Sequence, residues 1–133
     1  MDHGIQGIHG SLLLKEETYA VRGAVFAVYR TMGAGFLEAV YQECLGLEFS
    51  SLGIPFRATP QLKLSYRGTT LRHGYSPDFI CFEQIIVELK AARDIAPEHR
   101  AQTMNYLRAT GLQLGLLVNF GAPRGVQIER FAL

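Results

Sequence analysis

Two carboxylates and a lysine lie close together in the middle of the chain. Pro77-Asp78 is followed, after nine residues, by Glu88-Leu89-Lys90. Two carboxylates on neighbouring strands can hold a divalent cation, because hard cations such as Mg²⁺ prefer oxygen ligands and keep several waters. A lysine beside them can polarise one of those waters. The pattern predicts metal-assisted hydrolysis. The structural alternative is a surface ion pair on a half-exposed strand, and the residue pattern alone leaves both open.

The spacing of these residues restricts the turn that joins them. Glu88 and Lys90 are two apart, so on a strand they share one face, while Val87, Leu89 and Ala91 point into a core. Asp78 joins that face only if the loop between the two strands has an odd number of residues or a strand carries a bulge. A two-residue turn at 83–84 would place Asp78 on the opposite face.

A third carboxylate, Glu38, lies in the string that runs from Gly35 to Tyr41. Its position in the first turn of an expected helix has a plain explanation, because an acidic side chain there is stabilised by the helix dipole by roughly 0.3–1 kcal/mol. The functional interpretation is a third carboxylate facing the metal.

A polar face is expected on the helix that follows the Glu88 strand. His99, Gln102 and Tyr106 recur at three- and four-residue spacing, which places them on one side. Such a face is often only solvated. Here the helix follows the strand directly and can pack beside it, so Gln102 and Tyr106 are also candidates for the site.

The positions of apolar residues predict an α/β fold of one domain. The expected elements are helices at 11–32, 37–52 and from Pro97 to before Gly111, a strand-like region at 55–82 with a turn at Arg67-Gly68, a hairpin of 75–82 with 85–91, and strands at 114–120 and 126–131. The second helix should bury a stripe of Leu37, Val40, Tyr41, Cys44 and Leu45. The order is ααβββ(β)αββ, with helices flanking a mixed sheet of four to six strands.

Length and composition agree with that architecture. The chain has 133 residues, of which 48% are hydrophobic and 19% charged. We expect a flexible tail at 1–10 and a single domain at 11–133. No stretch reaches the ~20 apolar residues of a membrane span, and no secretory signal is evident, so we expect a cytoplasmic protein. Cys44 and Cys81 then fit buried free thiols better than a disulfide.

The charge balance argues against a tight, independent DNA-binding protein. Thirteen basic and twelve acidic residues give a net charge of +1, whereas phosphate contacts supply most of the affinity of such proteins. A nuclease is not excluded, because its acidic site is offset by bound cations. Ten of the thirteen basic residues are arginine, the better bidentate phosphate ligand. The candidates for phosphate contact are Arg72, Arg93, Arg100 and Arg108.

Other hydrolase classes lack their signatures here. The sequence has no Gly-x-Ser-x-Gly string, no His-Glu-x-x-His and no Walker-type loop. The two cysteines lack zinc-site spacing.

The string Gly35…Glu38…Tyr41 resembles the defining motif of the GxxExxY proteins, small bacterial proteins placed in the PD-(D/E)XK nuclease superfamily. The resemblance runs from about residue 18 to 133, and it departs at Tyr29, where relatives often carry His. It includes Gly23-Ala24, Ile54-Pro55-Phe56, the strand Val87–Lys90, the His-x-x-Gln spacing at 99–102 and the strand at 115–120.

The resemblance implies a restriction-endonuclease-like core and a set of roles. Asp78, Glu88, Leu89 and Glu38 would hold Mg²⁺ or Mn²⁺, and Lys90 would position or activate the attacking water. Gln102 and Tyr106 resemble the Q-x-x-x-Y motif of RecB-like nucleases.

The implied function is a metal-dependent nuclease that hydrolyses phosphodiester bonds of DNA, with no membrane partner and with a homo-oligomer or partner protein as a possibility. The alternative is a catalytically inactive nuclease-fold module that acts in nucleic-acid binding or protein assembly, since a fold does not fix a function.

Overall fold

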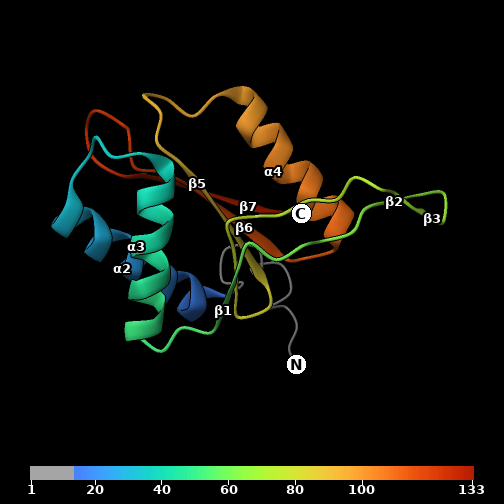
Figure 1. The fold of residues 1–133 in the computed structure, drawn as a ribbon, viewed down its shortest axis with the longest axis horizontal. Coiled ribbons are helices and arrows are strands. Elements are labelled where there is room, and N and C mark those ends of the chain that lie inside the picture. The colour runs from blue at the N-terminus through green and yellow to red at the C-terminus, as the bar shows by residue number, and fades with distance from the viewer. Residues whose placement is uncertain (1–13) are drawn as a thin grey trace, which may run out of the picture.

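The structure is a computed structural model and describes residues 14–133 (Figure 1). The tail expected at 1–10 and the first residues of the expected helix at 11–32 lie outside the described residues. The elements are, in chain order, α2 (Lys15–Met32), α3 (Glu38–Ser51), β1 (Phe56–Ala58), β2 (Ser65–Tyr66), β3 (Thr69–Thr70), β4 (Phe79–Cys81), β5 (Ile85–Lys90), α4 (Pro97–Thr110), β6 (Leu114–Asn119) and β7 (Gln127–Ala132). The α/β class and the positions of the three helices confirm the sequence prediction.

A mixed sheet of five strands forms the centre of the fold, in the order β1-β4-β5-β6-β7. The β5 and β6 strands are parallel and are joined by α4, whereas the other neighbours are antiparallel. The strand-like region at 55–82 forms only short strands, and β2 and β3 pair with each other outside the main sheet.

The two faces of the sheet are covered by different helices. On one face, α2 and α3 pack over a core that includes Val87 and Leu89 of β5. On the other face, α4 covers a smaller core that includes Ile80, Ile86 and Leu107. Because side chains alternate along a strand, Glu88 and Lys90 lie on the α4 face with Ile86. Figure 1 shows the sheet between these layers.

The hairpin between β4 and β5 has the odd loop that the shared face requires. Phe79 pairs with Val87 and Cys81 with Ile85, so three residues, 82–84, form the turn. Phe82 and Glu83 both adopt positive φ, at 55° and 56°. Continuing the register by one residue puts Asp78 opposite Glu88.

The start of α3 differs from the expected apolar stripe. Leu37 is 77% exposed, whereas Tyr41, Leu45 and Phe49 are fully buried. Leu37 has an extended backbone and precedes the first turn, so it lies outside the helical periodicity. The buried stripe therefore begins at Tyr41 and continues one turn beyond Leu45.

Two further expectations concern the cysteines and the membrane. Cys44 and Cys81 are both free, with Cys81 buried and Cys44 half-buried. Among the helices of residues 14–133, none is long and apolar enough to cross a bilayer.

Candidate functional site

Asp78 and Glu88 form the centre of the site, at the point where β4 diverges from β5. The main-chain N–H of Asp78 donates to Oε1 of Glu88 at 3.0 Å, and the N–H of Leu89 donates to Oδ2 of Asp78 at 2.8 Å. Each carboxylate is thus held by the backbone of the opposite strand. The expected grouping of Asp78, Glu88 and Lys90 on one face is present.

Two residues that sequence reasoning missed hold the remaining carboxylate oxygens. Gln42 of α3 donates from Nε2 to Oδ1 of Asp78 at 2.9 Å. The Tyr75 hydroxyl donates to Oε2 of Glu88 at 2.8 Å. Gln42 is separated from Asp78 by 36 residues, so no local pattern points to it. Tyr75 lies three residues before Asp78, and this closeness in the sequence was the one available signal; its burial is seen only in the structure.

Burial dominates the electrostatics of the two carboxyls. Loss of solvent raises the pKa of Glu88 to about 7, and the hydrogen bonds from Asp78 and Tyr75 only partly oppose it. Burial likewise raises the pKa of Asp78, against the hydrogen bond from Leu89. Two half-buried carboxyls this close disfavour double ionisation. The proximity of the two groups and their burial thus both oppose the second ionisation of the pair.

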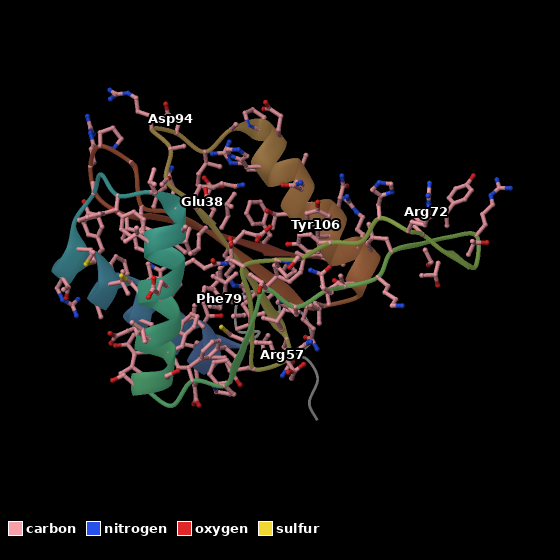
Figure 2. All side chains as sticks on the ribbon, viewed as in Figure 1. Glu38, Arg57, Arg72, Phe79, Asp94 and Tyr106 are labelled. Atoms are coloured by element: carbon pink, nitrogen blue, oxygen red, sulfur yellow. The ribbon has the colours of Figure 1, made fainter. Side chains whose placement is uncertain are left out.

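Lys90 and Glu38 lie around this pair. Burial raises the pKa of Glu38, and the positive charge of Lys90 opposes that effect. The Lys90 charge also lowers the pKa of Asp78 and of Glu88. Lys90 is thus the cation near all three carboxyls. Glu38 starts α3 beside the sheet and near α4, as Figure 2 shows, although most of the residue is exposed.

Tyr41 accounts for the position of Glu38. Its hydroxyl donates to the carbonyl of Gly33 at 2.5 Å and accepts from the N–H of Phe36 at 3.3 Å. Its buried ring stacks on Phe120 at 4.3 Å between centroids. The bend between α2 and α3 is therefore tied to the core by Tyr41, and this bend sets where α3 and Glu38 begin.

The polar face of α4 reaches the site through Tyr106. The Tyr106 ring stacks nearly parallel on Tyr75, which is the residue that donates to Glu88. Gln102 is exposed and donates from Nε2 to the Tyr106 hydroxyl at 2.9 Å. Tyr106 therefore contacts Glu88 only indirectly, through Tyr75, and Gln102 hydrogen-bonds to Tyr106 from an exposed position.

The four candidate arginines are dispersed. Arg100 is committed to a bidentate ion pair with Glu129 of β7, at 2.7 and 2.8 Å. Arg108 donates to Asn105 on its own helix. Arg93 is exposed and lies beside a pocket that also contains Arg124. Arg72 lies on the projecting segment near β3 (Figure 2). The structure does not bring these four together.

The donor set of the Asp78–Glu88 pair fits a small hard cation. Each of the four carboxylate oxygens accepts one of the hydrogen bonds above and has a second lone pair. Continuing the strand register places Pro77 opposite Leu89, and proline has no N–H to donate to the Leu89 carbonyl. Mg²⁺ is usually bound through one or two carboxylates and waters. In the part of the chain that the structure describes, no three His, Cys, Asp or Glu side chains form one cluster that could hold a metal, so Glu38 lies near the pair without completing a three-carboxylate site.

A match to a family model supports the same core. A family model described as the PD-(D/E)XK nuclease superfamily matches residues 15–131. No curated protein matches the chain. The solved structure titled "Crystal structure of SSO0001" is similar at 11% identity, with a TM-score of 0.46, over 86% of this chain and 76% of that one. The family match covers nearly all of the described residues, including both carboxylates and Lys90. The chain belongs to the PD-(D/E)XK nuclease superfamily.

Proposed function

We propose that this protein is a nuclease that uses Mg²⁺ or Mn²⁺ to hydrolyse phosphodiester bonds of DNA. The observation that carries the proposal is the Asp78–Glu88 pair, in which two half-buried carboxyls on facing strands are held by four hydrogen bonds beside Lys90. Partly burying two carboxyls side by side without a role is costly. A bound divalent ion would offset that cost.

In this proposal Asp78, Glu88 and the Leu89 carbonyl would hold the ion, and Glu38 would add negative charge nearby from the start of α3. When bound, the ion supplies a water of lowered pKa and a Lewis acid for the scissile phosphate. Lys90 orients the attacking water and offsets negative charge that develops on the phosphate. Gln42 and Tyr75 are positioning residues, because they hold the carboxylates in place.

Within the superfamily, we propose that the chain belongs with the GxxExxY proteins that its sequence resembles. Gly35, Glu38 and Tyr41 match that motif. The hydrogen bonds of the Tyr41 hydroxyl give a physical reason for the tyrosine in the motif, since they hold the bend after which Glu38 begins α3. A RecB-like role for Gln102 and Tyr106 is supported by the stacking of Tyr106 on Tyr75. We place these two residues at the edge of the substrate site.

Lys90 offers a test that separates chemistry from metal binding. The Lys90→Ala variant removes a positive charge beside the carboxylates, so it should bind Mn²⁺ at least as well as the wild type while losing cleavage of DNA. Metal binding is measured by the rise in melting temperature, and cleavage by gel electrophoresis of labelled oligonucleotides. A Lys90→Ala variant that cleaves at the wild-type rate would remove Lys90 from the mechanism.

A further inference from the structure

The β2–β3 hairpin projects from the body of the molecule, at the end away from α2 and α3 (Figure 1). Every residue from 65 to 74 is exposed. The turn is formed by Arg67 and Gly68, which both have positive φ, so it is the tight type that two-residue hairpin loops favour. An isolated two-stranded hairpin gains little stability from its own packing. Binding to another molecule would stabilise a projecting hairpin of this kind.

The charge of this region differs from that of the rest of the chain. Residues 49–77 contain four of the thirteen Lys and Arg residues, with His73 in addition, and none of the twelve acidic residues. The remaining residues therefore hold nine basic against twelve acidic side chains. The net charge of the whole chain is near zero, but residues 49–77, which include the hairpin, carry a net positive charge.

The pairing register sorts the hairpin into two faces. Ser65 pairs with Thr70 and Tyr66 with Thr69, and the N–H of Leu71 donates to the carbonyl of Leu64. Paired residues share a face and alternate residues change face. One face therefore presents the hydroxyls of Ser65 and Thr70, and Lys63 and Arg72 lie two residues beyond this pair, where the regular pairing ends. The other presents Tyr66 with Leu64 and Leu71.

A bulge concentrates the positive charge at the base of the hairpin. Leu62 bridges to Tyr75, which leaves Lys63 on one strand opposite Arg72, His73 and Gly74 on the other. A Cβ at Gly74 would lie 2.4 Å from the Leu62 carbonyl oxygen, so only glycine fits this bulge. Like charges on facing strands destabilise a sheet, and an anion between Lys63 and Arg72 would remove that repulsion.

The bulge also adjoins the candidate active site. Arg72 precedes Tyr75 by three residues, so their Cα atoms are separated by no more than about 11 Å. Tyr75 in turn donates to Glu88. A phosphate held at the bulge would therefore lie close to the Asp78–Glu88 pair.

The aromatic face identifies the form of nucleic acid. Tyr66 is 63% exposed at the end of the hairpin, and the Arg67 guanidinium lies 5.5 Å from the centre of its ring. An exposed ring beside basic groups is a platform on which unpaired bases stack. Bases inside a duplex are not available for such stacking.

We propose that the β2–β3 hairpin binds single-stranded DNA, with Lys63 and Arg72 on a phosphate and Tyr66 against a base. The choice of DNA rests on the proposed nuclease function. The hairpin acts as a substrate clamp that extends the site along the strand to be cleaved.

The test is binding of a labelled 20-nucleotide single strand and of its duplex, by fluorescence anisotropy in EDTA, so that binding is measured without cleavage. The Lys63→Ala/Arg72→Ala variant should weaken single-strand binding by about tenfold or more and flatten its salt dependence by about 0.7 in log–log slope, for the one phosphate that the two side chains hold. Tyr66→Ala should weaken it by about fivefold or more. The matched control Lys15→Ala/Arg30→Ala removes the same charge from exposed positions on α2 and should bind as the wild type does.

The outcomes distinguish this proposal from the nuclease proposal. If the wild type binds the single strand through these residues but does not cleave with Mn²⁺, the clamp stands and the nuclease fails. If the wild type cleaves and the Lys63→Ala/Arg72→Ala variant binds and cleaves equally well, the clamp is wrong and the nuclease stands. Equal loss in the α2 control, tighter binding of the duplex, or no DNA binding by the wild type would each overturn the clamp.

Discussion

Asp78 lies directly opposite Glu88, one position beyond the last paired residues of β4 and β5, and its main-chain N–H donates to Oε1 of Glu88 at 3.0 Å. The regular pairing of β4 with β5 ends at Phe79 and Val87, next to the two carboxylates. Because the backbone of each strand holds the carboxylate of the other, the hairpin register sets how the two groups face each other.

The first prediction concerns pH. Burial raises the folded pKa of Glu88 to about 7, above its usual 4.5. Stability from such a group is fully present below pH 4.5 and is lost as the pH rises through 7, because the folded state then binds more protons than the unfolded state. Without metal, the free energy of unfolding should fall by an amount on the order of 3 kcal/mol between pH 4.5 and 8. Urea unfolding in EDTA measures it.

Glu88→Gln is the matched variant for that measurement. It cannot ionise, so the decline with pH should largely disappear even if its overall stability is lower. Since burial raises the pKa of Asp78 in the same direction, a small residual slope is expected. A wild-type protein whose stability rises between pH 5 and 8 would contradict the raised pKa of Glu88.

The second prediction concerns the metal. A divalent ion that binds only the folded state stabilises it by roughly 2.7 kcal/mol at a hundredfold excess over its dissociation constant. For a domain of this size, Mn²⁺ or Mg²⁺ should raise the melting temperature by about several degrees. Asp78→Ala or Glu88→Ala should abolish the rise. A rise that persists in both variants would place the ion elsewhere.

The third prediction concerns Tyr75. Its hydrogen bond lowers the pKa of Glu88, so Tyr75→Phe should raise that pKa and let protons compete better with metal. The pH at which Mn²⁺ stabilises the protein half-maximally should shift upward. The substitution should lower the free energy of unfolding by only about 1 kcal/mol. Tyr66→Phe, which removes an exposed hydroxyl from the hairpin, is the control. An unchanged pH midpoint in Tyr75→Phe would reduce Tyr75 to a packing residue.

How much of this site could be predicted differs from residue to residue. The face shared by Asp78, Glu88 and Lys90 follows from the two-residue period of a strand, and this restricted the hairpin to an odd loop or a bulge. The three-residue loop itself was not predictable, because Phe82 and Glu83 adopt positive φ without the Gly or Asn that marks such turns. Leu37 was misassigned because its apolar character matches the helical stripe although the residue precedes the helix.

Contacts between residues far apart in the chain could not be predicted from the sequence. The stripe on α4 predicted that Tyr106 faces the site, but its stacking on Tyr75 depends on the bridge between Leu62 and Tyr75. The same holds for Asn119 at the end of β6. Its buried side chain bonds the N–H and the carbonyl of Ala92 and the N–H of Gly121.

The fourth prediction follows from Asn119. Those three hydrogen bonds hold the segment that leaves β5 just after Lys90. Asn119→Ala leaves buried polar groups without partners, at about 1–3 kcal/mol each, so we expect a loss of roughly 3 kcal/mol or more in urea unfolding. Asn105→Ala, at an exposed position on α4, should change stability by less than about 0.5 kcal/mol. Similar effects of the two substitutions would show that Asn119 has no special structural role.

The most direct measurement is cleavage of labelled single- and double-stranded DNA by the wild type with Mg²⁺ or Mn²⁺, beside Asp78→Ala prepared identically. Our proposal predicts cleavage that requires the metal, stops in EDTA and is absent in Asp78→Ala, with single-stranded DNA as the better substrate. Undetectable cleavage by a wild-type protein that binds the metal, or equal cleavage by Asp78→Ala, would contradict it.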